Sequence, residues 1–249
     1  METLNVKGFR LELDGASLYK DGKPLDRKAR KLSEMRDVLM DPGAINSKSM
    51  DDETYFMFRA LSSSDDSEAF KKYGVRYDVT IMEDYKLGME LNKTFGHYHP
   101  EAERGLSYPE VYEVIKGNAV MLLQKKLNDT DYEVILVHAE TGDKVIVEPN
   151  YGHITINAGP GRLVTANLVS EQFIPDYKSI ENKHGGAVYL TADDKKLRNK
   201  NYGNASVSED RNRPVPPFLG GSVGIYDSFI KTPDKFRFLN KPSLMGELL

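Results

Sequence analysis

The chain has 249 residues and a formal net charge of -4 at pH 7, and its 39% hydrophobic and 29% charged residues are typical of a globular protein rather than a disordered one. The length suits one large domain with extensions, and the acidic balance offers no broad positive field, so nucleic acid is not an expected partner. The absence of cysteine excludes disulfides, thiolate ligands and a thiol nucleophile, which leaves His, Asp and Glu as metal-binding side chains.

The first twenty residues lack the basic-then-apolar pattern of a signal peptide. No later stretch is apolar enough to span a bilayer. We therefore expect a cytoplasmic protein without a membrane partner.

Residues 1–75 are expected to form an extension that packs on the main domain. Four apolar residues in it recur at helical spacing: Leu32, Met35, Val38 and Leu39. They predict an amphipathic helix over 26–40, which ends at the Asp-Pro-Gly sequence of 41–43. The mixed segment 51–75 is expected to cap a barrel, with a short helix that Gly74 closes.

The part from 76 to 194 is expected to form the main domain, a β-barrel. Its short runs are rich in Val, Ile, Tyr and Thr and are separated by turn signals such as NDTD and NAGPG. Strands are predicted near residues 76–83, 88–99, 110–116, 118–125, 132–138, 144–148, 153–157, 162–169 and 186–191. Because no helix falls between consecutive strands, an antiparallel barrel or jelly roll is favoured over a parallel α/β sheet.

Residues 195–249 are expected to form a C-terminal arm. Its first part is polar and irregular, and the prolines at 214–217 with the glycines at 220–221 oppose regular structure. Five aromatic side chains follow: Phe218, Tyr226, Phe229, Phe236 and Phe238. They indicate that the arm packs on its own domain or across to a second subunit.

Three histidines and one glutamate are spaced as a metal site would need. His97 and His99 lie two apart in a predicted strand, so both side chains point to one face. Glu110 opens the next strand, where a hairpin connection would bring its carboxylate opposite the pair, and His153 comes from a distant strand. Such a set suits one Fe, Mn, Ni, Co or Zn ion and leaves positions open for substrate.

Each part of this pattern also has a plainer interpretation. An isolated His-x-His pair is a metal pair only about one time in four, because short motifs have low specificity. Glu110 alone would more often be a solvated carboxylate at a strand end. The combination is stronger than its parts, whereas His138 and His184 lack such company and are interpreted as a strand-face and a turn residue.

The His-x-His, Glu and Gly117 block, followed by Gly142-x10-His153-x3-Asn157, resembles the two cupin motifs. The ten residues between His99 and Glu110 exceed the usual loop. Pro149 and Gly152 are displaced from their usual places in the second block. The resemblance implies a mainly β fold, the cupin double-stranded β-helix or jelly-roll barrel.

More narrowly, TFGHYHP, PEVYEVIKG, MLLQ and the segment from Asn150 to Asn157 resemble the cupin-type glucose-6-phosphate isomerases, with similarity from about Met35 to Tyr189. This resemblance implies an enzyme that interconverts glucose 6-phosphate and fructose 6-phosphate, usually as a homodimer. It also implies one divalent metal ion per subunit, Fe2+ first, with Mn2+, Ni2+, Zn2+ or Co2+ as alternatives.

Two side chains are candidates for catalysis. Glu110, near or on the metal, can serve as the general base of an aldose-ketose isomerisation. Tyr112 lies two residues on, on the same strand face, where its hydroxyl would relay a proton or orient the substrate. Inward aromatic packing explains Tyr112 equally well.

For the substrate, the resemblance points to Thr80, Thr94 and Gly96 as phosphate contacts and to Tyr177 as a residue that closes over the sugar. Hydroxyls and a glycine amide would make an uncharged cradle, which agrees with the absence of a basic cluster in the sequence. This chain departs from the family at Pro175, where a histidine is expected.

Two other functions fit the same ligands. Cupins with three histidines and one glutamate include dioxygenases and decarboxylases, so the fold alone does not select the reaction. A noncatalytic cupin that only binds a sugar phosphate is the other alternative.

Overall fold

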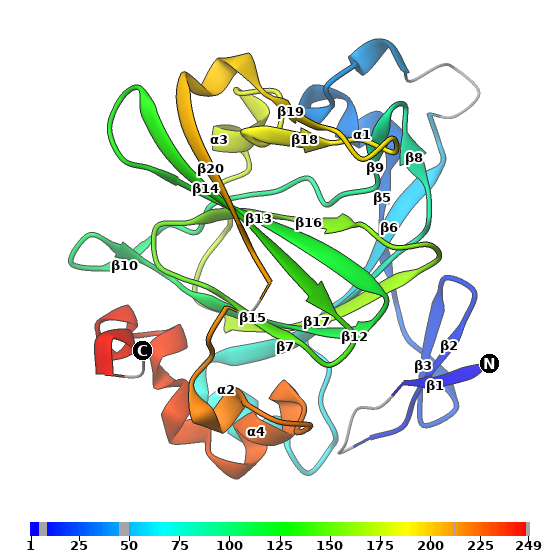
Figure 1. Ribbon diagram of the computed structural model, residues 1–249. Coiled ribbons are helices and arrows are strands. Elements are labelled where there is room, and N and C mark those ends of the chain that lie inside the picture. The colour runs from blue at the N-terminus through cyan, green and yellow to red at the C-terminus, as the bar shows by residue number, and fades with distance from the viewer. Residues whose placement is uncertain (5–8, 45–49, 212, 248–249) are drawn as a thin grey trace.

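Two β-sheets face one another at the centre of the chain in a computed structural model, which describes residues 1–4, 9–44, 50–211 and 213–247 (Figure 1). The larger sheet has six strands, all antiparallel to their neighbours, in the order β15 (Lys144–Val147), β12 (Glu110–Lys116), β17 (Leu163–Ser170), β7 (Val75–Met82), β6 (Glu53–Phe58) and β5 (Lys28–Lys31). The smaller sheet has four, in the order β16 (Gly152–Asn157), β13 (Asn118–Lys126), β14 (Asp131–Glu140) and β20 (Asn204–Asp210). This mainly β arrangement confirms the predicted fold class.

Alternation along the strands of the larger sheet divides its side chains between two faces. In β7, Tyr77, Val79 and Ile81 are buried in a cluster on the outer face, while Arg76 and Asp78 belong to the opposite face, toward the smaller sheet. The inner face is apolar elsewhere, where it packs against the smaller sheet. The interior therefore holds both a hydrophobic core and a patch of polar side chains.

The C-terminal arm covers the outer face of the larger sheet. Helix α4 (Ile225–Lys231) and the 3-10 helix of Pro233–Leu239 place Phe229 and Phe236 there, fully buried. Tyr226 meets Tyr77 of β7 edge to face, with ring centroids 5.1 Å apart. Of the two placements that the aromatic residues allowed, the arm packs on its own domain. Asn212 and residues 248–249 of the predicted arm lie outside the described residues.

The remaining elements are small and lie around the two sheets. A four-stranded N-terminal sheet is formed by β1 (Glu2–Leu4), β2 (Leu11–Asp14), β3 (Ser17–Lys20) and β4 (Lys23–Pro24). Three hairpins are β8 (Lys86–Leu87) with β9 (Glu90–Leu91), β10 (Glu101–Glu103) with β11 (Leu106–Ser107), and β18 (Val188–Leu190) with β19 (Lys196–Arg198). The other helices are α1 (Leu32–Met35), α2 (Ser67–Tyr73) and α3 (Lys178–Glu181), and further 3-10 turns are Arg36–Val38, Pro42–Ala44, Lys200–Tyr202, Pro217–Leu219 and Pro242–Glu247.

The predicted helix over 26–40 is wrong in its first part. Residues 28–31 form β5, an edge strand that pairs with β6, and only the four residues of α1 and a 3-10 turn are helical. The predicted cap of 51–75 likewise includes a strand, β6, although its short helix is confirmed as α2, which Gly74 closes with φ +57°. Pairing across the sheet satisfies these backbone groups and overrides the local helical pattern.

Strand β20 is a second correction, because the sequence 195–221 was expected to be irregular. Residues Asn204–Asp210 pair in parallel with residues 131–137 of β14. Only Ala205 and Val207 of this edge strand pack toward the core, so its apolar alternation is too short to indicate a strand in the sequence. The other predicted strands lie near their expected ranges, except for 88–99.

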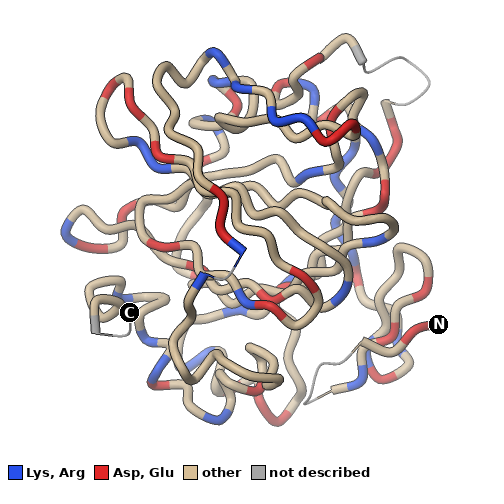
Figure 2. Tube along the Cα trace, in the orientation of Figure 1, with Lys and Arg blue, Asp and Glu red and all other residues tan. Residues whose placement is uncertain are grey.

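Charged residues are interspersed along the outer turns and edge strands, with acidic and basic positions mixed, as Figure 2 shows. None of the helices in the described part of the chain is long and apolar enough to cross a membrane.

Candidate metal centre

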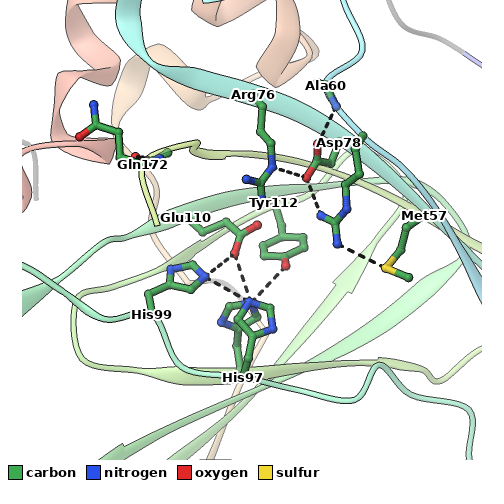
Figure 3. A network of polar contacts seen from close by, with 12 residues as sticks. Met57, Ala60, Arg76, Asp78, His97, His99, Glu110, Tyr112 and Gln172 are labelled. Atoms are coloured by element: carbon green, nitrogen blue, oxygen red, sulfur yellow. Dashed lines mark hydrogen bonds and ion pairs between the residues drawn. The ribbon is translucent and has the colours of Figure 1, made fainter. Parts of the chain in front are cut away.

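The four predicted ligands converge on one point inside the fold. One ligand atom from each of His97, His99, Glu110 and His153 lies within 4.8 Å of all the others. Glu110 is the first residue of β12, His153 lies in β16, and the other two come from the irregular segment beside β16 (Figure 3). The predicted metal group is therefore assembled from both sheets.

The segment 88–99 is not the regular strand that was expected. It forms one bridge to β16 between Lys93 and Ile156 and another between His97 and His153. From one bridge to the next this segment advances by four residues, whereas β16 advances by three. The extra residue makes a bulge at Gly96, which has φ +83°. Bulges reorient the side chains that follow them, and here the backbone of His97 pairs with that of His153 through two hydrogen bonds.

Gly96 also permits a close approach of backbone to side chain. A Cβ atom at this position would lie 2.4 Å from Cγ1 of Ile154 in β16. A side chain here would push the histidine segment away from β16, so both the positive φ and the space require glycine.

The distances within the group fit one bound ion. Nε2 of His97 and His99 are 3.1 Å apart, and Oε2 of Glu110 lies 3.4 Å from Nε2 of His99 and 3.2 Å from Nε2 of His153. Two ligand atoms about 2.1 Å from a common ion lie roughly 3.0 to 3.4 Å apart at ordinary coordination angles. The Glu110 Oε2 atom is fully buried and accepts no well-formed hydrogen bond, as expected of a ligand atom. The group can therefore hold one metal ion.

One ligand is oriented by a backbone contact. Nδ1 of His99 lies 2.8 Å from the carbonyl oxygen of Tyr108, which fixes the ring so that Nε2 faces the group. Burial is nearly complete for His99 and Glu110, whose side chains are 1% and 4% exposed.

The protonation states also suit metal binding. Burial lowers the pKa of His97 well below its usual value, and the imidazoles of His153 and His99 add to this effect. Burial likewise lowers the pKa of His153. Burial raises the pKa of Glu110, but the adjacent His153 and His99 outweigh it, so the net shift is well below the usual value. Neutral imidazoles and an ionised carboxylate are the forms that bind a cation.

The remaining predicted site residues line the cavity that opens from the metal group. Thr80, Thr94, Gly96, Tyr112 and Tyr177 all border it, and its empty volume is about 560 Å³ with the mouth included. Tyr112 has its hydroxyl oxygen 3.2 Å from Nε2 of His153. Burial raises the Tyr112 pKa well above its usual value, and the Glu110 carboxylate adds to this effect, so the hydroxyl keeps its proton.

Two arginines also line the cavity, although the sequence shows no basic cluster, and the uncharged cradle stays a prediction. Arg59, just after β6, and Arg76 of β7 both line it, and both donate hydrogen bonds to Asp78 (Figure 3). The sequence held a signal for two of these residues. In the predicted strand 76–83, Arg76 and Asp78 have the same alternation as Thr80, so they share its face.

Aromatic side chains cover the metal group from the segment after β17. Phe173 was not predicted as a site residue, and its ring centroid lies 4.3 Å from that of His99. The ring centroids of Tyr177 and His97 are 5.2 Å apart. Two backbone hydrogen bonds between Tyr98 and Asp176 hold this segment in place. Pro175 borders the cavity in the same stretch.

The other two histidines are outside the site, as their plainer interpretations predicted. Nε2 of His138 in β14 lies 2.9 Å from a carboxylate oxygen of Glu209. His184 has φ +57°, in the turn after α3.

Comparisons with known proteins match most of this chain. The glucose-6-phosphate isomerase family model matches residues 29–206. Glucose-6-phosphate isomerase from Thermococcus gammatolerans is 29% identical over 157 residues, which cover 63% of this chain and 76% of that protein. The enzyme of the same name from Pyrococcus furiosus is 27% identical over 146 residues, covering 53% and 73%.

Solved structures overlap only in part. The match to oxalate decarboxylase from Bacillus subtilis is 20% identical in sequence and has a TM-score of 0.35. It covers 49% of this chain and 28% of that chain. The family model, by contrast, spans most of the chain and includes all four residues of the metal group. The chain therefore belongs to the glucose-6-phosphate isomerase family.

Proposed function

We propose that this protein interconverts glucose 6-phosphate and fructose 6-phosphate with one divalent metal ion bound by His97, His99, Glu110 and His153. The observation that carries the proposal is the metal group itself, with Glu110 and Tyr112 side by side on one strand inside a cavity. Membership of the family supports the choice of sugar phosphate. The donor set of three imidazoles and a carboxylate suits Fe2+, and also Mn2+, Ni2+, Zn2+ or Co2+.

Aldose-ketose isomerisation moves a hydrogen between C1 and C2 and shifts the carbonyl group between them. When bound, the ion would act as a Lewis acid for the oxygens on these two carbons. The protein must supply the proton acceptor, the proton donor and a dry site. The near-complete burial of the His99, Glu110 and His153 side chains and the aromatic cover of Phe173 and Tyr177 meet the last need.

Glu110 is the proposed proton acceptor. Its carboxylate is ionised and buried, and it faces the cavity from the start of β12. It would take the proton from the carbon next to the carbonyl group and return it to the neighbouring carbon.

Tyr112 is the proposed hydrogen-bond donor. Because burial favours the protonated hydroxyl, it can donate a hydrogen bond to a sugar oxygen. Its present contact with Nε2 of His153 places that hydroxyl at the edge of the metal group.

Thr80, Thr94, Gly96 and Tyr177 are proposed to contact the rest of the substrate. All four border the same cavity. The Thr94 hydroxyl accepts a hydrogen bond of 3.0 Å from the Thr155 amide, which ties the bulged segment to β16 and keeps the hydroxyl at the cavity wall. Tyr177 packs edge to face on Phe95, with ring centroids 5.6 Å apart.

A coupled assay tests the proposal against its rivals. The purified protein is stripped of metal, each divalent ion is restored separately, and conversion of fructose 6-phosphate to glucose 6-phosphate is followed under nitrogen. We expect turnover without oxygen and with more than one metal. A dioxygenase would need oxygen, and a binding protein would show thermal stabilisation by the sugar phosphate without turnover. Absence of turnover with every metal would contradict the isomerase proposal.

We also propose that the protein forms a homodimer, as the family resemblance implies. Sedimentation equilibrium gives the mass directly. A mass of one 28.1 kDa chain at micromolar concentration would contradict the dimer.

A further inference from the structure

A lysine and a glutamate are buried together just before the segment that carries the first metal ligand. The side chains of Lys93 and Glu90 are 5% and 1% exposed, and the ammonium group donates a hydrogen bond to the carboxylate. The same ammonium donates to the carbonyl oxygen of Val38 at 2.9 Å, and the other carboxylate oxygen accepts the backbone amide of Met40 at 2.5 Å. Each charge therefore has one partner in the pair and one in the N-terminal extension.

This ion pair is enclosed where β9, β18 and the 3-10 turn after α1 meet (Figure 1). Nζ of Lys93 lies 5.0 Å from the ring centroid of Tyr189 in β18, and Val38 of the turn is fully buried. Burial lowers the pKa of Lys93, whereas the Glu90 carboxylate raises it, so the charged form depends on this partner. A buried charge that loses its partner is strongly destabilising. The pair is therefore sensitive to displacement of either residue.

The backbone of Lys93 is also the point at which its segment joins β16. Lys93 stands opposite Ile156, and the amide of Thr94 donates to the carbonyl oxygen of Thr155 at 2.9 Å. The next bridge to β16 is at His97, after the bulge. Lys93 and Thr94 are therefore fixed on β16 just before the bulge that orients the first metal ligand.

A buried ion pair can determine the register in which a segment pairs. Four residues of this segment span three residues of β16, and backbone pairing alone does not determine where the extra residue falls. A slip of one residue after Glu90 would take Lys93 away from both the carboxylate and the Val38 carbonyl, and would leave the two charges buried without each other. The same slip would turn His97 to the opposite face, because side chains alternate along an extended segment. The observed register satisfies the ion pair and the metal group together.

We propose that Glu90 and Lys93 are positioning residues, which fix the register of residues 93–97 on β16 and so place His97 in the metal group and Thr94 at the cavity wall. Thr94 and His97 border the cavity, and the ion pair acts on them through the backbone that it holds. For its effect on turnover, the proposal rests on the proposed function. For its effect on metal binding, it needs no substrate.

A variant that removes both charges separates positioning from stability. Glu90→Gln combined with Lys93→Met keeps the side-chain volumes and an acceptor for the Met40 amide. Neutral replacement of a whole buried ion pair often leaves stability unchanged, so the denaturation midpoint should stay near that of the wild type. The affinity of the metal-free protein for Co2+ should fall by about tenfold or more, and the visible absorption of bound Co2+ should change, because residues that orient ligands carry effects of that size. At saturating metal, kcat for fructose 6-phosphate should fall as well.

Glu68→Gln combined with Lys71→Met is the matched control, because this pair in α2 has the same spacing in sequence but is exposed. It should bind Co2+ as the wild type does. Loss of Co2+ affinity in the Glu90 and Lys93 variant alone supports the positioning role even if the wild type turns over no sugar, a result that would contradict only the isomerase proposal.

Wild-type Co2+ affinity and absorption in the folded double variant would overturn the assignment, as would no Co2+ binding by the wild type. If the double variant does not fold, Glu90→Asp takes its place, since it keeps the charge but is one methylene too short to reach both Lys93 and the Met40 amide. Its Co2+ affinity should also fall, and an unchanged affinity in this variant would overturn the assignment.

Discussion

The hydroxyl oxygen of Tyr112 lies 3.2 Å from Nε2 of His153, the nitrogen that faces the metal group. Oε2 of Glu110 lies 3.2 Å from the same nitrogen. Glu110 and Tyr112 share one face of β12, so a single strand delivers a proton acceptor and a proton donor to one point. This pairing yields two predictions about catalysis.

Replacement of Glu110 by glutamine should leave the protein folded and reduce kcat by about 10²- to 10⁴-fold, because general acid-base groups contribute that range. The coupled assay at saturating metal measures the loss. Glu113→Gln is the matched control, since Glu113 lies in the same strand on the other face, where it accepts the amide of Ile225 at 2.8 Å. Activity of Glu110→Gln equal to that of the control would contradict the assigned role.

Replacement of Tyr112 by phenylalanine keeps the ring and removes the hydroxyl. If the hydroxyl donates to the substrate, kcat should fall roughly tenfold while thermal stability changes little, because one neutral hydrogen bond is lost. Tyr151→Phe, whose hydroxyl donates to Glu133 away from the site, is the control. An unchanged kcat in Tyr112→Phe would assign Tyr112 a packing role.

The bulge at Gly96 can be tested against a second glycine with the same backbone angle. Gly96 has φ +83° and Gly161 has φ +84°. A Cβ atom at Gly96 would lie 2.4 Å from Ile154, whereas a Cβ atom at Gly161 would have no neighbour within 4 Å. Alanine at either position carries the left-handed penalty of about 1 to 2 kcal/mol. Gly96→Ala should cost about 1 to 3 kcal/mol more through overpacking, and should also weaken metal binding. Denaturant unfolding measures both variants, and equal losses would contradict the close approach.

Removal of the metal should make stability depend on pH. The pKa values of His97 and His153 are lowered by burial in the folded state, so below pH 6.5 the unfolded chain binds protons that the folded chain does not. The stability of the metal-free protein is therefore full above about pH 6.5 and decreases as the pH falls below it, by up to about 1.4 kcal/mol per pH unit for each histidine. The pKa of Glu110 is also lowered in the folded state, so this residue further decreases the stability as the pH falls below 4.5, its usual pKa.

Thermal unfolding in a chelator between pH 8 and pH 5 measures this effect. His153→Gln should show a shallower fall than the wild type, whereas His138→Gln, at the exposed pair with Glu209, should match it. A melting temperature that is flat from pH 8 to pH 5 in the metal-free wild type would contradict the proposed linkage.

The sequence predicted the metal ligands and most barrel strands because their signals are local. Alternation within a strand and the spacing of His97, His99, Glu110 and His153 depend on few neighbours. Strand β5 depends on its pairing with β6, and β20 on its pairing with β14, because β5 has only one apolar residue and β20 only two. Long-range pairing of this kind leaves little trace in one sequence.

The prediction of the residues that line the cavity was incomplete for a different reason. Thr80, Thr94 and Gly96 were placed by resemblance, and all three reach the cavity. Arg59 and Arg76 are absent from that pattern, and they are seventeen residues apart in sequence, so no basic cluster is visible. Only the pairing of β6 with β7 brings them to the same carboxylate of Asp78.

Titration of the metal-free protein with Fe2+ under nitrogen tests the central claim most directly, with isomerase activity and bound metal measured at each step. Activity should rise linearly and stop rising at one ion per chain, and His153→Ala should remain folded with neither tight metal binding nor activity. Full isomerase activity in the metal-free protein, or in His153→Ala, would contradict the account.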